Sequence, residues 1–334
     1  MPESIAKGCP EPVRWTGRTL RLLDQRYLPA RESYVDCESA DDVAGAITDM
    51  VVRGAPAIGV AAAFGLALAA RADDATVAGL ALAGEALKQA RPTAVNLAWA
   101  VDRVLGRCQT ESSLAADVLA EAQAIQAEDL RANHAMARHA TECLQGRVNV
   151  YTHCNTGSLA TAGFGTALGV IRQLKAEDRL GEVYVGETRP WLQGARLTAW
   201  ELAMDGIHPT LVVDSAAASV MRAGRVDVVI TGADRITADG GVLNKIGTYG
   251  LAVLARHHGL RMMVVAPMST VDMDSTSASQ IEIEQRPPDE VTTWAGQRHA
   301  PQDVAVFNPV FDATPYALID WIVTEQGVFR PAIS

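Results

Sequence analysis

Two residues whose side chains can move protons each follow a short apolar segment of the sequence. Cys154 lies in Tyr151-Thr-His-Cys-Asn-Thr-Gly157, where a strand is expected to end before a glycine-containing helix. Asp234 occupies an equivalent place in Ile230-Thr-Gly-Ala-Asp-Arg235. A thiol and a carboxylate at the ends of two strands of one sheet can act together as a proton-transfer pair. We therefore take these two residues as the candidate catalytic pair.

The sequence around Cys154 offers the thiol a polarising environment. A thiol titrates near pKa 8.5 and is reactive only when its surroundings favour the thiolate. The segment Thr156-Gly-Ser158 is expected to open a helix, whose dipole and free N–H groups would have this effect. His153 is adjacent in sequence, but neighbours on a strand point to opposite faces, so a Cys–His dyad is not expected. The alternative is a buried structural cysteine.

Small residues precede Asp234 and permit close approach of a ligand. A partly buried carboxyl group has its pKa raised by desolvation and can then donate a proton near neutral pH. The alternative is that Asp234 caps a helix or forms a salt bridge with Arg235.

A third set of residues can bind a phosphate. The segment Arg53-Gly-Ala-Pro-Ala-Ile-Gly59 joins two expected helices; Gly54 lets backbone N–H groups face outward and Arg53 adds charge. This is not a Walker A loop, because no Gly-Lys-Ser/Thr follows. The alternative is a plain turn between two helices.

Other polar residues extend this set. Arg91 is a further candidate cation, and Asn244-Lys245 is expected to open a helix, which would place the charge of Lys245 beside a helix N-terminus. Gln193 is suited to hydrogen-bond a hydroxyl group. Taken singly, exposed Arg and Lys residues are more often solvated surface. The alternative for Gln193 is a residue at the N-terminus of a helix.

The elements that must position these residues fall into two predicted domains, 1–145 and 146–334. The first begins with a short β-rich stretch (18–24 and 34–35) and continues as helices. Ser39 and Asp42 form a predicted capping box at the start of one helix. The apolar run Gly54 to Ala70 is rich in Ala and Gly and is expected to be a buried helix, not a membrane span. Further helices are expected at 76–90, 93–107 and 112–144.

The second predicted domain alternates short β-branched runs with helical segments. This pattern predicts an α/β fold with a Rossmann-like, doubly wound parallel sheet, and 268–303 as a long polar loop. Ligands of such sheets bind at the carboxyl ends of the strands, near a topological switch point. Strands are expected at 148–152, 182–186, 210–213, 227–231, 261–266 and 304–307, and helices at 158–175, 194–205, 215–223, 246–258 and 315–326. Polar residues follow the strands: Cys154, Glu187, Asp214, Asp234 and Asn308.

Composition limits the possible functions. The 334 residues carry a formal net charge of -10, which argues against a broad nucleic-acid or anionic-membrane surface. The 5 cysteines are scattered without a C-x-x-C pair, so neither a disulfide framework nor a thiolate zinc site is favoured. A reducing, cytoplasmic location is the simplest expectation.

Long segments of the chain resemble the methylthioribose-1-phosphate isomerase family of methionine salvage. The resemblance runs along nearly the whole chain. It rests on Val51-Val-Arg-Gly-Ala-Pro-Ala-Ile-Gly59, on Thr152-His-Cys-Asn-Thr-Gly-Ser-Leu-Ala-Thr161 and on the segment from Glu187 to Leu202. Gly232-Ala-Asp-Arg-Ile236, Asn244-Lys-Ile-Gly-Thr-Tyr249 and Phe307-Asn-Pro-Val-Phe-Asp312 extend it.

This resemblance implies an aldose–ketose isomerase that acts on a small sugar phosphate without cofactor or metal. It also implies a homodimer with a small helical N-terminal domain and a Rossmann-like C-terminal domain. Asp234 matches the family's proton donor and Cys154 its catalytic cysteine. The substrate-binding positions of the family match Arg53, Gly54, Ala55, Arg91, Gln193, Asn244 and Lys245.

The chain departs from the family pattern at three places. Asp239-Gly-Gly241 replaces the usual Asn-Gly-Asp, Gly186 stands where many members carry an acidic residue, and Ser158 replaces a usual alanine. These departures leave a 5-deoxyribose-1-phosphate isomerase as an alternative function. A non-enzymatic alternative is a regulatory subunit of the translation initiation exchange factor, which shares the fold.

Overall fold

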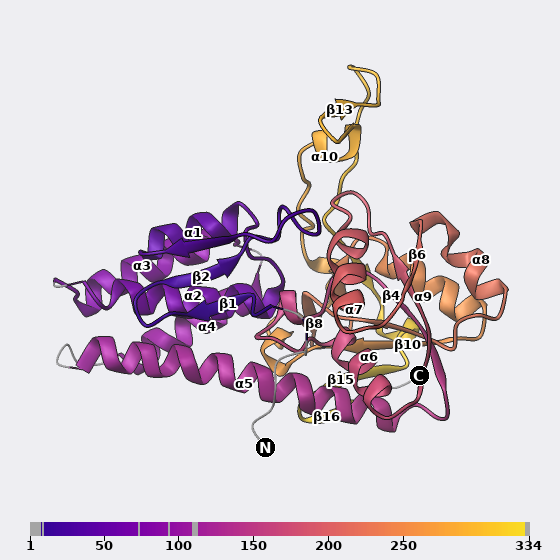
Figure 1. Cartoon of the computed structure of the whole chain (residues 1–334), viewed down its shortest axis with the longest axis horizontal. Helices are drawn as coiled ribbons and strands as arrows, with labels where there is room; N and C mark the ends of the chain where they lie inside the picture. Colours follow the sequence, from indigo (N-terminus) through magenta and orange to yellow (C-terminus); the bar gives the residue numbers. More distant parts are fainter. Residues whose placement is uncertain (1–7, 9, 73, 93, 109–112, 331–334) are drawn as a thin grey trace.

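The computed structural model describes residues 8, 10–72, 74–92, 94–108 and 113–330. Its N-terminal part combines a small antiparallel sheet with a group of helices (Figure 1). The capping box predicted for the first helix is present, because the side chains of Ser39 and Asp42 each accept the other's backbone N–H. The elements are β1 (Val13–Trp15), β2 (Leu20–Leu23), β3 (Tyr34–Cys37), α1 (Ala40–Thr48), α2 (Ala55–Ala69), α3 (Val77–Ala90), α4 (Val95–Arg107) and α5 (Leu114–Glu142).

Helix α2 is the centre of this part, because small residues let neighbouring helices approach it closely. Every residue from Ala57 to Leu68 is buried, which confirms the prediction for this apolar run. Gly59 packs directly on α4: a Cβ here would lie 2.8 Å from the carbonyl oxygen of Asn96. Within the described ranges, no helix is long and apolar enough to cross a membrane.

A seven-stranded sheet forms the C-terminal part, with strand order β16-β15-β10-β7-β4-β5-β6. All neighbouring strands are parallel except the edge strand β16, which pairs antiparallel with β15. From β4 the chain moves outward through β5 and β6, then returns to add β7 on the other side. The switch point therefore lies between β4 and β7. The strands are β4 (Val148–Thr152), β5 (Leu180–Gly186), β6 (Thr210–Val212), β7 (Val228–Thr231), β10 (Arg261–Val265), β15 (Trp321–Thr324) and β16 (Gly327–Phe329).

Helices cover both faces of this sheet. On one face, apolar residues of α5 and α6 (Ala167–Ala176) pack on the strands together with Leu202 of α7 (Ala199–Met204). On the other face lie α8 (Ala217–Arg222) and α9 (Thr248–His257). Helix α5 runs beneath both halves of the molecule in Figure 1 and contributes residues to the cores of both. The mixed α/β fold with a parallel sheet is confirmed.

Several of the predicted elements are wrong. Residues 304–307 form no strand, and 315–326 is not a helix but a 3₁₀ turn (Tyr316–Leu318) followed by β15. The Trp-Ile-Val-Thr sequence of β15 has the aromatic and β-branched side chains that suit a strand. The expected helix 158–175 is interrupted, because Gly163 and Gly165 have positive φ and α6 begins only after them.

A second, four-stranded sheet packs beside the carboxyl edge of the first. It has the order β11-β8-β9-β14. Asn244 and Lys245 end strand β9 and do not open a helix as predicted; α9 begins at Thr248. The segment 268–303 is not a plain loop, since it contains β11 and a projecting arm with α10 (Figure 1). The elements are β8 (Arg235–Thr237), β9 (Val242–Lys245), β11 (Val271–Asp272), β14 (Phe311–Thr314), α10 (Asp289–Thr292), β12 (Thr293–Trp294) and β13 (Gln297–Arg298).

Candidate active site

A cleft opens where the N-terminal helices meet the carboxyl edge of the parallel sheet. Cys154 follows β4 and Asp234 follows β7, the two strands that flank the switch point. Parallel neighbours bring these side chains to the same edge. The structure brings all nine predicted site residues together on this cleft: Arg53, Gly54, Ala55, Arg91, Cys154, Gln193, Asp234, Asn244 and Lys245.

Cys154 is held in an unusual backbone conformation. Its φ is 63°, in the left-handed region that residues other than glycine seldom occupy. Its backbone N–H donates to Oγ1 of Thr188 at 2.8 Å, and its carbonyl oxygen accepts from Thr198 at 2.6 Å. The amide of Gln193 lies 3.4 Å from the thiol sulfur. A strained residue held by specific hydrogen bonds is typical of a functional position.

The neighbouring histidine is directed elsewhere, as the sequence predicts. Nε2 of His153 lies 2.8 Å from the carbonyl oxygen of Ile246, at the start of the turn into α9. Burial lowers the pKa of His153. His153 therefore fixes the turn next to Lys245 and is not the partner of the thiol.

Asp234 faces the cleft on a loop that glycine brings close to the loop after β4. A Cβ on Gly232 would lie 2.6 Å from a methyl carbon of Thr156. Burial raises the pKa of Asp234, and the cations Lys245, Arg53 and Arg91 act in the opposite direction. Arg235, the alternative partner considered from the sequence, pairs with Asp272 at 3.1 Å. A carboxyl group with a raised pKa can hold and donate a proton.

Positive charge is concentrated on the same cleft. Burial lowers the pKa of Arg91, with Arg286 as a further contribution in the same direction. Burial also lowers the pKa of Lys245, which Cys154 and Asp234 counteract. The ammonium group of Lys245 lies 4.7 Å from the centre of the Phe311 ring. Partly buried cations that outnumber the acidic groups beside them are suited to bind an anionic ligand.

The beginning of α2 adds backbone donors to these cations. Gly54 is the N-cap residue, and the first N–H groups of a helix have no intrahelical partner. These N–H groups and the positive end of the helix dipole favour a phosphate. Arg53, one residue earlier, donates to the side-chain oxygen of Asn155 at 2.5 Å and to its carbonyl oxygen at 3.0 Å.

Gly54→Ala is expected to lower the free energy of unfolding by about 1–3 kcal/mol and to impair phosphate binding. The φ of Gly54 is 96°, and an added Cβ would lie 2.5 Å from Cβ of Ala160. Urea unfolding followed by circular dichroism measures the change. Gly45→Ala in α1 is the control, since an added Cβ there meets nothing within 4 Å, and it is expected to stabilise the chain. Equal effects of the two substitutions would contradict this account.

The prediction missed residues that the structure adds to the cleft. Arg286 and Glu290 come from the segment read as a plain loop, and they form an ion pair at 3.2 Å. Asn155 adjoins the predicted cysteine, but nothing in the sequence indicated that it binds Arg53. Only the charges of the arm and the polar neighbours of Cys154 could have suggested these residues.

The polar residues predicted at strand ends separate into two groups. Cys154, Asp234 and Asn308 line the cleft, although the strand expected before Asn308 is absent. Asp214 instead accepts two backbone N–H groups in the loop after β5, at 2.9 and 2.7 Å. Glu187 is not among the cleft residues. Among the residues described, no cluster of three or more His, Cys, Asp or Glu side chains is arranged to hold a metal ion.

Comparisons with known proteins place this geometry in context. The model of the "Initiation factor 2 subunit family" matches residues 51–331. The methylthioribose-1-phosphate isomerase of Stenotrophomonas maltophilia is 55% identical, over 95% of this chain and 91% of that protein.

Two solved structures are similar over almost the whole chain. The 5-methylthioribose 1-phosphate isomerase of Pyrococcus horikoshii superposes with a TM-score of 0.90 at 44% identity, covering 97% of this chain and 93% of that one. The translation initiation factor eIF-2B subunit delta of A. fulgidus gives a TM-score of 0.85 at 40% identity, with 97% and 96% covered.

Proposed function

The chain belongs to the initiation factor 2 subunit family, and we propose that Asp234 and Cys154 carry out the isomerase reaction in its cleft. The chain acts as an aldose–ketose isomerase of methionine salvage, because relatives of this name are 55% identical over nearly its whole length. The reaction converts 5-methylthioribose 1-phosphate to 5-methylthioribulose 1-phosphate. The observation that carries the residue assignment is the placement of a thiol and a carboxyl group just after the adjacent strands β4 and β7, beside a group of cations.

The phosphate is bound by the cationic side of the cleft. Arg53, Arg91 and Lys245 supply charge, and the N–H groups at the start of α2, after Gly54, supply directed hydrogen bonds. The amides of Gln193 and Asn244 bind hydroxyl groups of the sugar. Such binding fixes the sugar between the thiol and the carboxyl group.

Ring opening is the first chemical step. The phosphate on the anomeric oxygen prevents the sugar from opening by itself, so the ring must open with the phosphate in place. Protonated Asp234 gives its proton to the ring oxygen as the bond from that oxygen to C1 breaks. The pKa of Asp234, raised by burial, supports this role.

Hydrogen transfer from C2 to C1 follows, by one of two routes. In the proton route the Cys154 thiolate removes the C2 proton and the resulting thiol returns a proton to C1. In the hydride route the C2 hydrogen moves with its electron pair to electron-poor C1, and Cys154 stabilises the charge. In both routes the C2 hydroxyl proton goes to the Asp234 carboxylate, which leaves the ketone and restores the acid.

Phosphorus NMR of the purified protein tests the proposal. We expect 5-methylthioribose 1-phosphate to convert to a ketose 1-phosphate without any added protein. The ratio of the conversion rates of 5-methylthioribose 1-phosphate and 5-deoxyribose 1-phosphate measures the specificity for the C5 substituent. Light scattering on the same sample tests the homodimer that we also propose. A folded protein that converts neither sugar would overturn the assignment and favour the regulatory-subunit alternative.

A further inference from the structure

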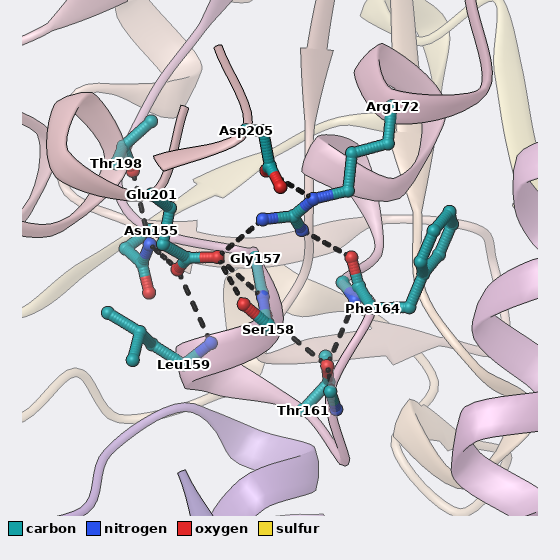
Figure 2. Close-up of polar contacts among 12 residues, drawn as sticks. Asn155, Gly157, Ser158, Leu159, Thr161, Phe164, Arg172, Thr198, Glu201 and Asp205 are labelled. Carbon is teal, nitrogen blue, oxygen red and sulfur yellow. Dashed lines mark hydrogen bonds and ion pairs between the residues drawn. The ribbon is translucent and has the colours of Figure 1, made fainter. Parts of the chain in front are cut away.

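A fully buried carboxylate lies behind the cleft without touching it. Glu201 of α7 is 0% exposed and accepts hydrogen bonds at both oxygens (Figure 2). Oε1 accepts from the side chain of Asn155 at 2.7 Å and from the N–H of Leu159 at 3.3 Å. Oε2 accepts from the N–H and hydroxyl of Ser158, at 2.7 and 2.6 Å, and from Arg172 at 2.9 Å. Glu201 thus holds the loop that follows Cys154.

These bonds determine how the Asn155 amide is oriented. Its nitrogen donates to Glu201 and, at 3.3 Å, to Thr198, so its oxygen must face the opposite side. That oxygen accepts from Arg53 at 2.5 Å. An unbroken chain of hydrogen bonds therefore leads from Glu201 through Asn155 to the guanidinium group on the cleft.

We propose that Glu201 is a positioning residue for phosphate binding: through Asn155 it fixes the guanidinium group of Arg53 toward the ligand. Glu201 touches neither the substrate nor the reacting atoms. The proposal rests on the assignment of Arg53 as a phosphate ligand. It also gives Ser158, which stands where the family usually has alanine, a role as an additional donor to Glu201.

A neutral amide cannot replace the carboxylate here. Glu201 accepts five hydrogen bonds from four residues, and an amide has only one accepting oxygen. In Glu201→Gln, the NH₂ group must face either Asn155 and Leu159 or Ser158 and Arg172. In the first case the new NH₂ group faces the NH₂ group of Asn155, and the repulsion between them disturbs the orientation of the Asn155 amide directly. In the second it breaks the ion pair that holds Glu201 in place.

Competitive inhibition by inorganic phosphate measures this effect separately from stability. Glu201→Gln is expected to raise the inhibition constant for phosphate, and KM for the sugar phosphate, by about 10-fold, with a smaller change in kcat. Asp205→Asn is the matched control. Asp205 pairs with the same Arg172 at 2.7 Å but has no contact with Asn155. It is expected to lower the unfolding temperature and leave the phosphate inhibition constant unchanged.

A double-mutant cycle tests the route through Asn155. Asn155→Ala is expected to weaken phosphate inhibition about 10-fold, and adding Glu201→Gln to it changes the constant by less than about 3-fold. If the two substitutions weaken phosphate inhibition additively, or if Asp205→Asn has an equal effect, the proposal is overturned.

A fallback covers a Glu201→Gln variant that does not fold. In that case Asn155→Ala alone decides, and unchanged phosphate inhibition in that variant would overturn the inference. If Arg53→Ala weakens phosphate inhibition while the other variants do not, only the role of Glu201 fails; if Arg53→Ala has no effect, the phosphate assignment fails with it.

Discussion

Replacing Asp234 with Asn is expected to lower kcat by about 10³-fold or more, with substrate binding retained. The amide has the shape of the carboxyl group but cannot give a proton to the ring oxygen. Binding is retained because the neutral amide matches the protonated carboxyl group in shape and charge, and the cations Arg53, Arg91 and Lys245 are unchanged. Phosphorus NMR gives the rate, and calorimetric titration with the sugar phosphate gives the affinity.

The pH dependence of kcat distinguishes this role from a structural one. Burial raises the pKa of Asp234, so the proton-donating form persists above the ordinary range of a carboxyl group. Activity should be present below the raised pKa and fall as the pH rises through it. The residual activity of Asp234→Asn should lack this decline. A variant that keeps the wild-type rate would show that Asp234 is not the acid.

Replacing Cys154 with Ala is expected to lower kcat by about 10²–10⁴-fold, because both routes of hydrogen transfer use the thiol. If Cys154 is instead a structural cysteine, the alternative considered from the sequence, Cys154→Ala should lower the stability of the protein and leave kcat normal. Cys37→Ala is the control for it. Cys37 is fully buried in the core of the N-terminal part. The Cys37→Ala variant should therefore lose stability and keep its activity. Normal kcat in Cys154→Ala would restrict Cys154 to a structural role.

Deuterium at C2 of the substrate separates the two routes in the wild-type protein. In the proton route the label spends time on Cys154 and exchanges in part with water. In the hydride route it passes directly to C1 and is retained in full. The sequence left this choice open.

The sequence predicted which edge of the sheet borders the cleft, because its signals there are local. Apolar β-branched runs define β4 and β7, and the polar residues that follow them must lie at the carboxyl edge of a parallel sheet. The nine site residues also matched the family pattern position by position. The division of the chain near residue 145 remains a prediction.

The parts that were missed depend on contacts between distant segments. Strand β15 lies in the segment 315–326, which was predicted as a helix. Its four residues are too short a run to outweigh that prediction, and its pairing with β10 and β16 is a contact between segments. Asn155 lies 102 residues from its partner Arg53, and Glu201 lies 46 residues from Asn155. No periodicity or spacing encodes such hydrogen bonds, since they arise only when separate loops and helices have packed.

The two candidate catalytic residues follow β4 and β7 and do not lie within them. The sheet is held together by the strands and by the helices on its faces, which contain neither the thiol nor the carboxyl group. Gene duplication can therefore produce a copy that loses both residues and still folds. In this architecture the chemistry can disappear during evolution while the scaffold survives and is recruited for assembly.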